Sequence, residues 1–246
     1  MKGCVLILGA TSAIARGIAA AFARRGHSLY LAGRDAAELA RDAANLRVRY
    51  GVEVRHAAFD ALRPETHAAF VAELRAAVGV PAGVVVAFGY LGTQAAASRD
   101  CDETARILAV NFTGAVSILD RLALEMETRG SGFIVGLASV AGDRGRQSNY
   151  TYGAAKGGFA LYLQGLRNRL FPAGVRVLTV KPGFVDTAMT FGMPGLFLVA
   201  DPMQVGERIC RGVEQGRDVL YVPAFWRLIM TIIRSIPETV FKRLKL

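Results

Sequence analysis

The sequence predicts a single-domain, doubly wound α/β fold with a seven-stranded, mostly parallel sheet and helices on both faces. Short apolar segments alternate with helical segments along the chain, which is the pattern of a parallel sheet joined by helical crossovers. The 246 residues suit one such sheet, and no Pro/Ser-rich linker, repeat or block of like charge divides them. A hydrophobic content of 52% allows a large core.

The first expected strand is a short apolar run bounded by Gly, as in a sheet that is buried on both faces. The seven runs are residues 5–8, 28–32, 52–59, 83–88, 133–137, 175–180 and 218–222. Helical patterns at 35–50 and 66–77 separate three of them. Right-handed crossovers then bring the carboxyl ends of the strands to one edge, where a sheet of the Rossmann type binds its ligand.

The turn after the first strand has the context of a phosphate-binding loop. Residues 9–17 read GATSAIARG, between a buried strand and a helical pattern. We expect the loop to bind a dinucleotide, with the backbone N–H groups around Ser12, Ala13 and Ile14 facing a pyrophosphate at the positive end of the helix. Gly9 and Thr11 belong to the same loop.

Arg34 follows the second strand, where a nucleotide-binding sheet selects its cofactor. An acidic residue there would bind ribose hydroxyls, whereas a basic one accommodates a 2′-phosphate. We therefore favour NADP(H), with NAD(H) as the other option. The alternative is that Arg34 is an ordinary solvated residue before a helix that Asp35 caps.

A Ser, a Tyr and a Lys follow the fifth strand. They are Ser139, Tyr152 and Lys156. Residues four apart share a helix face, so Lys156 is expected beside Tyr152, where its charge would lower the pKa of the phenol and make it a proton donor. Ser139 would hydrogen-bond the same substrate oxygen. The Y-x-x-x-K spacing alone also occurs on ordinary amphipathic helices.

The net charge of +10 suggests a nucleic-acid partner, but the basic residues form no aromatic-interleaved patch over most of the chain. We therefore expect no nucleic-acid binding. The three histidines, His27, His56 and His67, stand in no ligand spacing and are interpreted as surface or helix-end residues. No metal site is predicted.

The cysteines are scattered, which suits a reducing cytosol rather than a disulfide framework. They are Cys4, Cys101 and Cys210. The start of the chain runs directly into a strand and is too short for a signal peptide, and no run reaches the roughly 18 uninterrupted apolar residues of a membrane span. We expect a cytoplasmic protein.

The last 23 positions, 224–246, form an amphipathic basic tail, set apart from a reductase domain at 1–223. Basic and polar residues recur on one side of a helix at positions 227, 231, 234 and 238, opposite an apolar face. Such a helix suits the interface of an anionic membrane. The alternative is a tail that packs against its own domain or a dimer mate.

Residues 188–200 read AMTFGMPGLFLVA. Apolar residues with paired glycines suit a mobile lid over a substrate. A loop packed permanently on the core is an equal alternative.

The ordered set of motifs resembles the short-chain dehydrogenase/reductase family over nearly the whole chain. The matching residues are Gly9, Arg34, Asp60, Asn111, Ser139, Tyr152, Lys156, Pro182, Gly183 and Thr187. The resemblance implies that Tyr152 is the general acid/base, that Ser139 polarises a carbonyl and that Lys156 holds the nicotinamide ribose. Asn111 would anchor a water in a proton relay behind Lys156.

The resemblance also implies further cofactor contacts. Asp60 would contact the adenine, and Val185 with Thr187 the nicotinamide carboxamide. Phe88 and Gly89, at the exit of the fourth strand, would pass close to the cofactor. Two departures stand out: Ala13 and Ala15 replace the second and third glycines of the first loop, and AFGY at 87–90 replaces the usual Asn-Asn-Ala-Gly.

The tail, with VAFGYLG at 86–92 and YVPAFWR at 221–227, resembles one branch of the family, the reductases of polyprenyl-phosphoryl 2-keto-pentoses such as the decaprenyl-linked ones. The likeness implies a ketosugar on a lipid phosphate, reduced at the cytoplasmic membrane face after a separate oxidase has made the ketone. A homo-oligomer is common in the family. Alternatives are a reductase of another hydrophobic ketone or acyl carbonyl, and a non-catalytic nucleotide-sensing or membrane scaffold protein.

Overall fold

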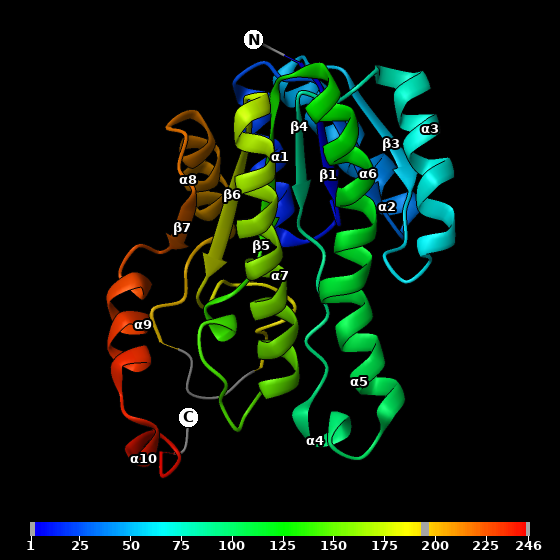
Figure 1. Cartoon of the computed structure of the whole chain (residues 1–246). Helices are drawn as coiled ribbons and strands as arrows, with labels where there is room; N and C mark the ends of the chain where they lie inside the picture. The colour runs from blue at the N-terminus through cyan, green and yellow to red at the C-terminus, as the bar shows by residue number, and fades with distance from the viewer. Residues whose placement is uncertain (1–2, 193–196, 245–246) are drawn as a thin grey trace.

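Seven parallel strands form one sheet in the order β3-β2-β1-β4-β5-β6-β7. The computed structural model describes residues 3–192 and 197–244 (Figure 1). The strands are β1 (Val5–Leu8), β2 (Leu29–Gly33), β3 (Val54–Ala58), β4 (Gly83–Val86), β5 (Gly132–Leu137), β6 (Val175–Pro182) and β7 (Val219–Val222). The predicted sheet is confirmed, with β3 shorter at both ends than the expected 52–59.

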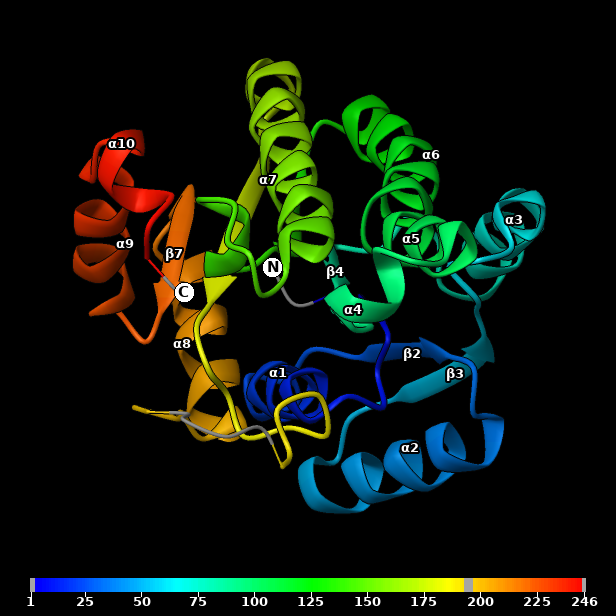
Figure 2. The same ribbon diagram turned by 90° about the horizontal axis from the view of Figure 1, so that it is seen from below.

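Helices cover both faces of the sheet, which Figure 2 shows edge-on between two helical layers. One layer contains α1, α2 and α8, and the other contains α3, α6 and α7. The helices are α1 (Ala13–Arg24), α2 (Ala36–Tyr50), α3 (His67–Val78), α4 (Gln94–Ala97), α5 (Cys101–Leu108), α6 (Gly114–Arg129), α7 (Tyr150–Leu170), α8 (Pro202–Glu214), α9 (Trp226–Ser235) and α10 (Glu238–Phe241).

Alternation along the strands divides the core between the two faces. Ile7 and Val85 belong to the cluster under α1, α2 and α8, whereas their neighbours Leu6 and Val84 belong to the cluster under α3, α6 and α7. Successive side chains of a strand point to opposite faces, and both faces here are buried. The continuous apolar runs that identified the strands in the sequence follow from this double burial.

One continuous helical stretch, Cys101–Arg129, is long and apolar enough to cross a membrane by length and composition. It comprises α5, a π-helical turn at Ala109–Thr113 and α6. Its inward side chains, including Ile118 and Leu122, are fully buried in the core against the sheet. That packing is typical of a core helix in a globular domain.

The C-terminal helices pack with one face against the rest of the domain. Trp226 and Met230 of α9 are 3% and 1% exposed. The Arg144 guanidinium donates hydrogen bonds to the carbonyl oxygen of Ile233 at 2.7 Å, near the end of α9, and lies 3.7 Å from the ring centre of Phe241 in α10. The inner face of the tail therefore packs against its own domain, which is one of the alternatives predicted for the tail.

The outer face of α9 stays open to solvent. Leu228 and Ile232, one turn apart, are 66% and 58% exposed, with Arg227 and Arg234 also exposed on the same helix. Figure 1 shows α9 and α10 at the end of the molecule toward which the strands point. An exposed apolar stripe with basic residues thus lies on the side of the sheet where ligands are expected.

His67 is a helix-end residue, as interpreted from the sequence, but it does not lie on the surface. It begins α3 but is fully buried, stacked on Phe59 with ring centres 4.9 Å apart. Its Nδ1 lies 3.0 Å from the Ser117 hydroxyl and its Nε2 lies 3.2 Å from the carbonyl oxygen of Asp60. Burial lowers the pKa of His67 below its ordinary value.

His67 should make the fold sensitive to acid. Since its pKa is lower in the folded chain, the unfolded chain binds more protons as the pH falls below about 6.5, and stability decreases there. We expect His67→Gln to be destabilised at pH 7.5 but to lose less urea midpoint than the wild type between pH 7.5 and 5.5. His56→Gln, at an exposed position, is the matched control. An equal loss in all three proteins would contradict this role of His67.

Candidate active site

The predicted site residues gather at one edge because they follow the ends of parallel strands. Several of them stand just past a carboxyl end of a strand. They are Gly9 after β1, Arg34 after β2, Asp60 after β3, Phe88 and Gly89 after β4, Ser139 after β5, and Gly183 after β6. The strand order reverses between β1 and β4, which is the usual place for a dinucleotide in such a sheet.

Gly9 makes the turn at this reversal point. Its φ of 79° favours glycine, and a β-carbon there would lie 2.6 Å from the backbone nitrogen of Phe88. The next residues close the loop, since the Ser12 N–H donates to the Gly9 carbonyl at 3.2 Å and the Ser12 hydroxyl accepts from the Ala15 N–H at 3.2 Å. The Ser12 N–H is thus engaged within the loop, and its contact with a pyrophosphate stays a prediction.

The two alanines fit this loop. Ala13 is the first residue of α1 and is half-buried, while the Ala15 methyl is fully buried in the core under that helix. Within the described ranges, the N–H groups of Ala13 and Ile14 donate no hydrogen bond to other backbone groups outside helices and strands. They remain at the helix N-terminus, where an anionic phosphate binds well.

Arg34 and Asp60 lie farther along the edge. The Arg34 side chain is exposed, and no carboxylate of the described residues lies within 4.0 Å of it. Asp35 caps α2 by accepting from the Glu38 N–H at 2.9 Å, as predicted. Asp60 is half-buried and accepts from the Leu62 N–H at 3.0 Å. A guanidinium is thus available at the position that distinguishes a 2′-phosphate.

Ser139, Tyr152 and Lys156 come from β5 and α7. The Ser139 oxygen accepts from the Ala141 N–H at 3.1 Å, which leaves its O–H to donate elsewhere. Tyr152 and Lys156 are 9% and 3% exposed. The Lys156 ammonium donates to the carbonyl oxygen of Leu137, the last residue of β5, at 2.8 Å. The helix is thereby fastened to the strand end beside Ser139.

Burial controls the titration of both helix residues. It raises the pKa of Tyr152 to about 12, with hydrogen bonding to Ser139 opposing the rise, and it lowers the pKa of Lys156 to about 8. The predicted lowering of the phenol pKa is therefore not met, because burial desolvates the phenolate and raises the pKa. Tyr152 holds its proton at neutral pH, in a form that can give it to an alkoxide.

Asn111 is buried in the π-helical turn, and its side chain is fully used by the protein. Its Nδ2 donates to the carbonyl oxygens of Ile107 at 2.8 Å and Tyr90 at 2.6 Å, and its Oδ1 accepts from the Tyr90 N–H at 3.2 Å. These bonds join the exit of β4 to the π-helical turn, and the role of Asn111 in anchoring a water stays a prediction. A π-helical turn is frequent at functional sites.

The backbone at Gly89 lies close to the side chains of Asn111 and Lys156. A β-carbon on Gly89 would lie 3.1 Å from Oδ1 of Asn111 and 3.5 Å from the Lys156 ammonium. The exit of β4, the π-helical turn and α7 therefore meet here. A side chain at this exposed position would crowd the ammonium.

The segment that follows β6 packs closely against Trp226 of the tail. A β-carbon on Gly183 would overlap the Trp226 indole, at 1.8 Å from its nitrogen. Pro182 and Val185 are buried. The predicted contact of Val185 with a carboxamide would therefore be made by the backbone of Val185 rather than by its side chain. Thr187 remains half-buried, with its hydroxyl 3.3 Å from that of Thr190.

The segment 188–200 is described except at 193–196. Val185 pairs with Ala200, and the Phe197 ring centre lies 5.7 Å from that of Trp226. Phe191 is 86% exposed. In the described part of this segment, one aromatic ring packs on Trp226 and other apolar side chains are exposed. The interpretation of the segment as a lid stays a prediction.

Contacts that the sequence reasoning missed hold the loop between Ser139 and Tyr152. The Asp143 carboxylate accepts from the Lys181 ammonium at 2.5 Å and from the Tyr221 hydroxyl at 2.7 Å. Long-range pairs of this kind leave no signal in local spacing. They fix the loop to β6 and β7.

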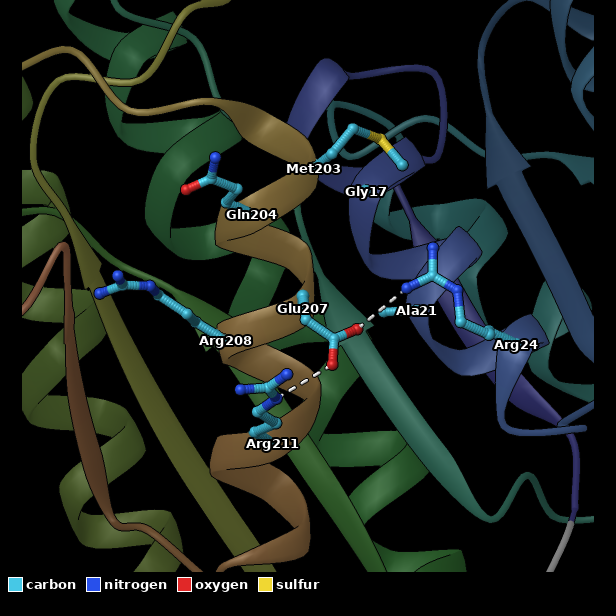
Figure 3. A pocket seen from close by; sticks show the side chains of 8 residues that line it. All are labelled: Gly17, Ala21, Arg24, Met203, Gln204, Glu207, Arg208 and Arg211. Carbon is cyan, nitrogen blue, oxygen red and sulfur yellow. Dashed lines mark hydrogen bonds and ion pairs between the residues drawn. The ribbon is translucent and has the colours of Figure 1, made fainter.

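A hollow of about 370 Å³ lies elsewhere, in the groove between α1 and α8. Figure 3 shows Glu207 between two arginines that line it, with Arg211 at 3.0 Å and Arg24 at 3.4 Å. The hollow contains none of the predicted catalytic residues, and its carboxylate is already paired. We place the active site at the sheet edge.

The chain belongs to the short-chain dehydrogenase family, because the family model for short chain dehydrogenases matches residues 3–193. Its activity class is accordingly that of an NAD(P)-dependent oxidoreductase.

Among individual proteins, the chain is 37% identical over 240 residues to an uncharacterized oxidoreductase of Mycobacterium tuberculosis, covering 98% of this chain and 96% of the relative. It is 36% identical over 243 residues to one of Streptomyces coelicolor, covering 98% and 95%.

Solved structures share the fold. The actinorhodin polyketide ketoreductase with NADPH has a TM-score of 0.82 at 23% identity, covering 92% of this chain and 97% of that one. A short-chain dehydrogenase from Sphingobium yanoikuyae in complex with NADPH has a TM-score of 0.77 at 27% identity, covering 96% and 97%.

The residues at the edge fit a nicotinamide dinucleotide. Ala13 and Ile14 would offer N–H groups to a pyrophosphate, and Arg34 would offer a guanidinium to a 2′-phosphate. Lys156 presents a buried ammonium, charged below about pH 8, beside the open position at Gly89. The bound cofactor supplies hydride chemistry, and Tyr152 holds the proton that a reduced carbonyl oxygen needs.

Tyr152→Phe should abolish reduction without loss of cofactor. Removal of the proton donor is expected to lower kcat about 10²–10⁴-fold, while the Kd for NADPH, measured by fluorescence titration, stays within a few-fold. Tyr150→Phe is the matched control, since the Tyr150 hydroxyl binds only Ser98, at 2.9 Å, among the described side chains. Wild-type turnover in Tyr152→Phe would remove Tyr152 from the mechanism.

Proposed function

We propose that this oxidoreductase is an NADPH-dependent reductase of a 2-keto sugar carried on polyprenyl phosphate. The observation that carries the proposal is the exposed stripe of Leu228 and Ile232 on α9, flanked by Arg227 and Arg234, beside the catalytic edge. Apolar side chains that enter the acyl boundary and arginines that meet anionic headgroups suit a membrane surface. An enzyme docked this way would reach a lipid-linked substrate.

The length of α9 supports a helix that lies on the membrane. Its ten residues span about 15 Å, half of the hydrocarbon thickness. The inner face already packs on the domain through Trp226, so the helix need not leave the protein in order to bind. The catalytic edge would then face the cytoplasmic leaflet.

In the proposed reaction the carbonyl oxygen accepts hydrogen bonds from Ser139 and Tyr152. As that oxygen becomes an alkoxide, it takes the Tyr152 proton, because the phenol is the stronger acid of the two. The Lys156 ammonium, held by the carbonyl of Leu137, stabilises the phenolate that is left. A separate oxidase would supply the ketone.

A reductase of another hydrophobic ketone or acyl carbonyl is the second candidate. Tyr152 lies in an apolar cluster with Ile107 and Ala155, against which Tyr90 and Leu91 pack, and this environment would suit such a substrate. NADPH oxidation with a polyprenyl-phosphoryl 2-keto-pentose and with a long-chain β-ketoacyl ester separates the two. Turnover of the ester alone would contradict the lipid-linked sugar.

Self-association is part of the proposal. Leu124 on α6 and Leu161 on α7 are 59% and 68% exposed on helices of the same layer. Exposed leucines on adjacent helices support a homo-oligomer through this layer. That surface is separate from the α9 stripe.

Arg34 should set the cofactor preference. Replacing it by Asp removes the partner of a 2′-phosphate and adds repulsion, so the ratio of kcat/KM for NADPH to that for NADH should fall at least about tenfold. Arg41→Asp, at an exposed position of α2, is the control and should keep the wild-type ratio. An unchanged ratio in Arg34→Asp would make Arg34 an ordinary surface residue.

Membrane binding is best tested on the outer face of α9, because truncation of the tail would also remove the buried Trp226. We expect the full chain to float with vesicles that contain phosphatidylglycerol and the double variant Leu228→Glu, Ile232→Glu to stay in the protein fraction. Val48→Glu, at an 86% exposed apolar residue of α2, should float like the wild type. Equal flotation of all three would remove the membrane argument.

A further inference from the structure

Two buried polar atoms without a partner lie in the loop that joins Ser139 to Tyr152. Among the described residues four side-chain atoms are buried and make no hydrogen bond: Glu125 Oε2, Arg146 Nε, Asn149 Oδ1 and Trp226 Nε1. Glu125 lies on α6, away from the edge, and the Trp226 nitrogen faces the Cα of Gly183. Arg146 and Asn149 remain.

Arg146 and Asn149 share one turn. The Asn149 N–H donates to the carbonyl oxygen of Arg146 at 3.2 Å, and the Gly153 N–H donates to that of Asn149 at 2.8 Å as α7 begins. The turn precedes Tyr152 directly and follows the short helical turn that Ser139 caps. The two side chains therefore stem from the segment between the two carbonyl-binding hydroxyls.

Arg146 is a half-buried cation with no counter-charge. In the described part of the chain no carboxylate lies within 4.0 Å of its guanidinium. The nearest acid along the chain, Asp143, is occupied by Lys181 and Tyr221. Burial lowers the pKa of Arg146, which reflects an uncompensated charge. Such a charge is costly to keep, and an anionic ligand would offset the cost.

Asn149 stands at the N-cap of α7 without capping it. An Asn there normally accepts from a first-turn N–H and stabilises the helix, but its side chain makes no such bond. Gln94 does this instead, since its Oε1 accepts from the Thr151 N–H at 2.9 Å. The side-chain oxygen of Asn149, Oδ1, consequently has no partner among the described residues, and we expect it to accept from a ligand hydroxyl.

We propose that Arg146 and Asn149 form a substrate subsite for a phosphorylated sugar, in which the Arg146 guanidinium pairs with the phosphate and the Asn149 side chain accepts from a sugar hydroxyl. A guanidinium matches two phosphate oxygens at once. The inference rests on the proposed function and assigns the recognition of the polar part of its substrate. It applies equally to a phosphodiester that carries a lipid and to a free phosphate ester.

The test is calorimetric titration of the full chain saturated with NADP⁺. D-Ribulose 5-phosphate and its neutral parent, D-ribulose, are the two probes. We expect the wild type to bind the phosphate ester at least about tenfold more tightly, and Arg146→Met to reduce this preference to about twofold or less. Arg146→Lys should keep part of it. Arg41→Met, at an exposed site on α2, should keep all of it.

The variant Asn149→Ala is the second part of the same calorimetric test. It should weaken both sugars by a similar factor and leave the phosphate preference in place, while the thermal unfolding temperature stays near that of the wild type because Asn149 does not cap α7. Absence of a phosphate preference in the wild type, or its persistence in Arg146→Met, would overturn the subsite. NADPH oxidation with any ketone is measured separately, so failure of the reductase proposal is recognised independently.

Discussion

The hydrogen bond from the Lys156 ammonium to the carbonyl oxygen of Leu137 fixes the geometry on which the site depends. Lys156 is 3% exposed, so its charge needs a partner inside the protein, and the end of β5 provides one. This contact sets the position of α7 on the sheet. Tyr152, one turn earlier on the same helix, thereby lies near Ser139. One buried charge thus aligns helix, strand and catalytic hydroxyls.

The fold could be predicted from the sequence because its central strands, such as β1, β2 and β4, are buried on both faces. Runs such as 5–8 and 83–88 are continuous and apolar, and glycines or charges bound them. Parallel pairing then places every strand end, and so every motif after a strand, at one edge. The glycine turn at Gly9 and the Asp35 cap follow local rules of backbone geometry. Features that depend only on neighbouring residues can be predicted from the sequence.

What could not be predicted depends on contacts distant in sequence. His67 reads as a helix-end residue, yet Phe59 and Ser117 enclose it. The pKa of Tyr152 was expected to fall, because spacing reveals a neighbouring Lys but does not reveal how completely the phenol is desolvated. The side-chain oxygen of Asn149 lacks a partner among the described residues because Gln94 takes over its capping role. Each outcome is decided by tertiary packing.

Arg144 has a consequence for how this chain can vary. Its guanidinium stands in the loop between Ser139 and Tyr152, the proposed catalytic residues, yet it binds the carbonyls at the end of α9 and stacks on Phe241. A change in the tail alone would leave this guanidinium without partners, and a change of Arg144 alone would loosen the tail. Substitutions at the two places should be tolerated mainly in pairs, so that lineages that diverge at one diverge together at the other.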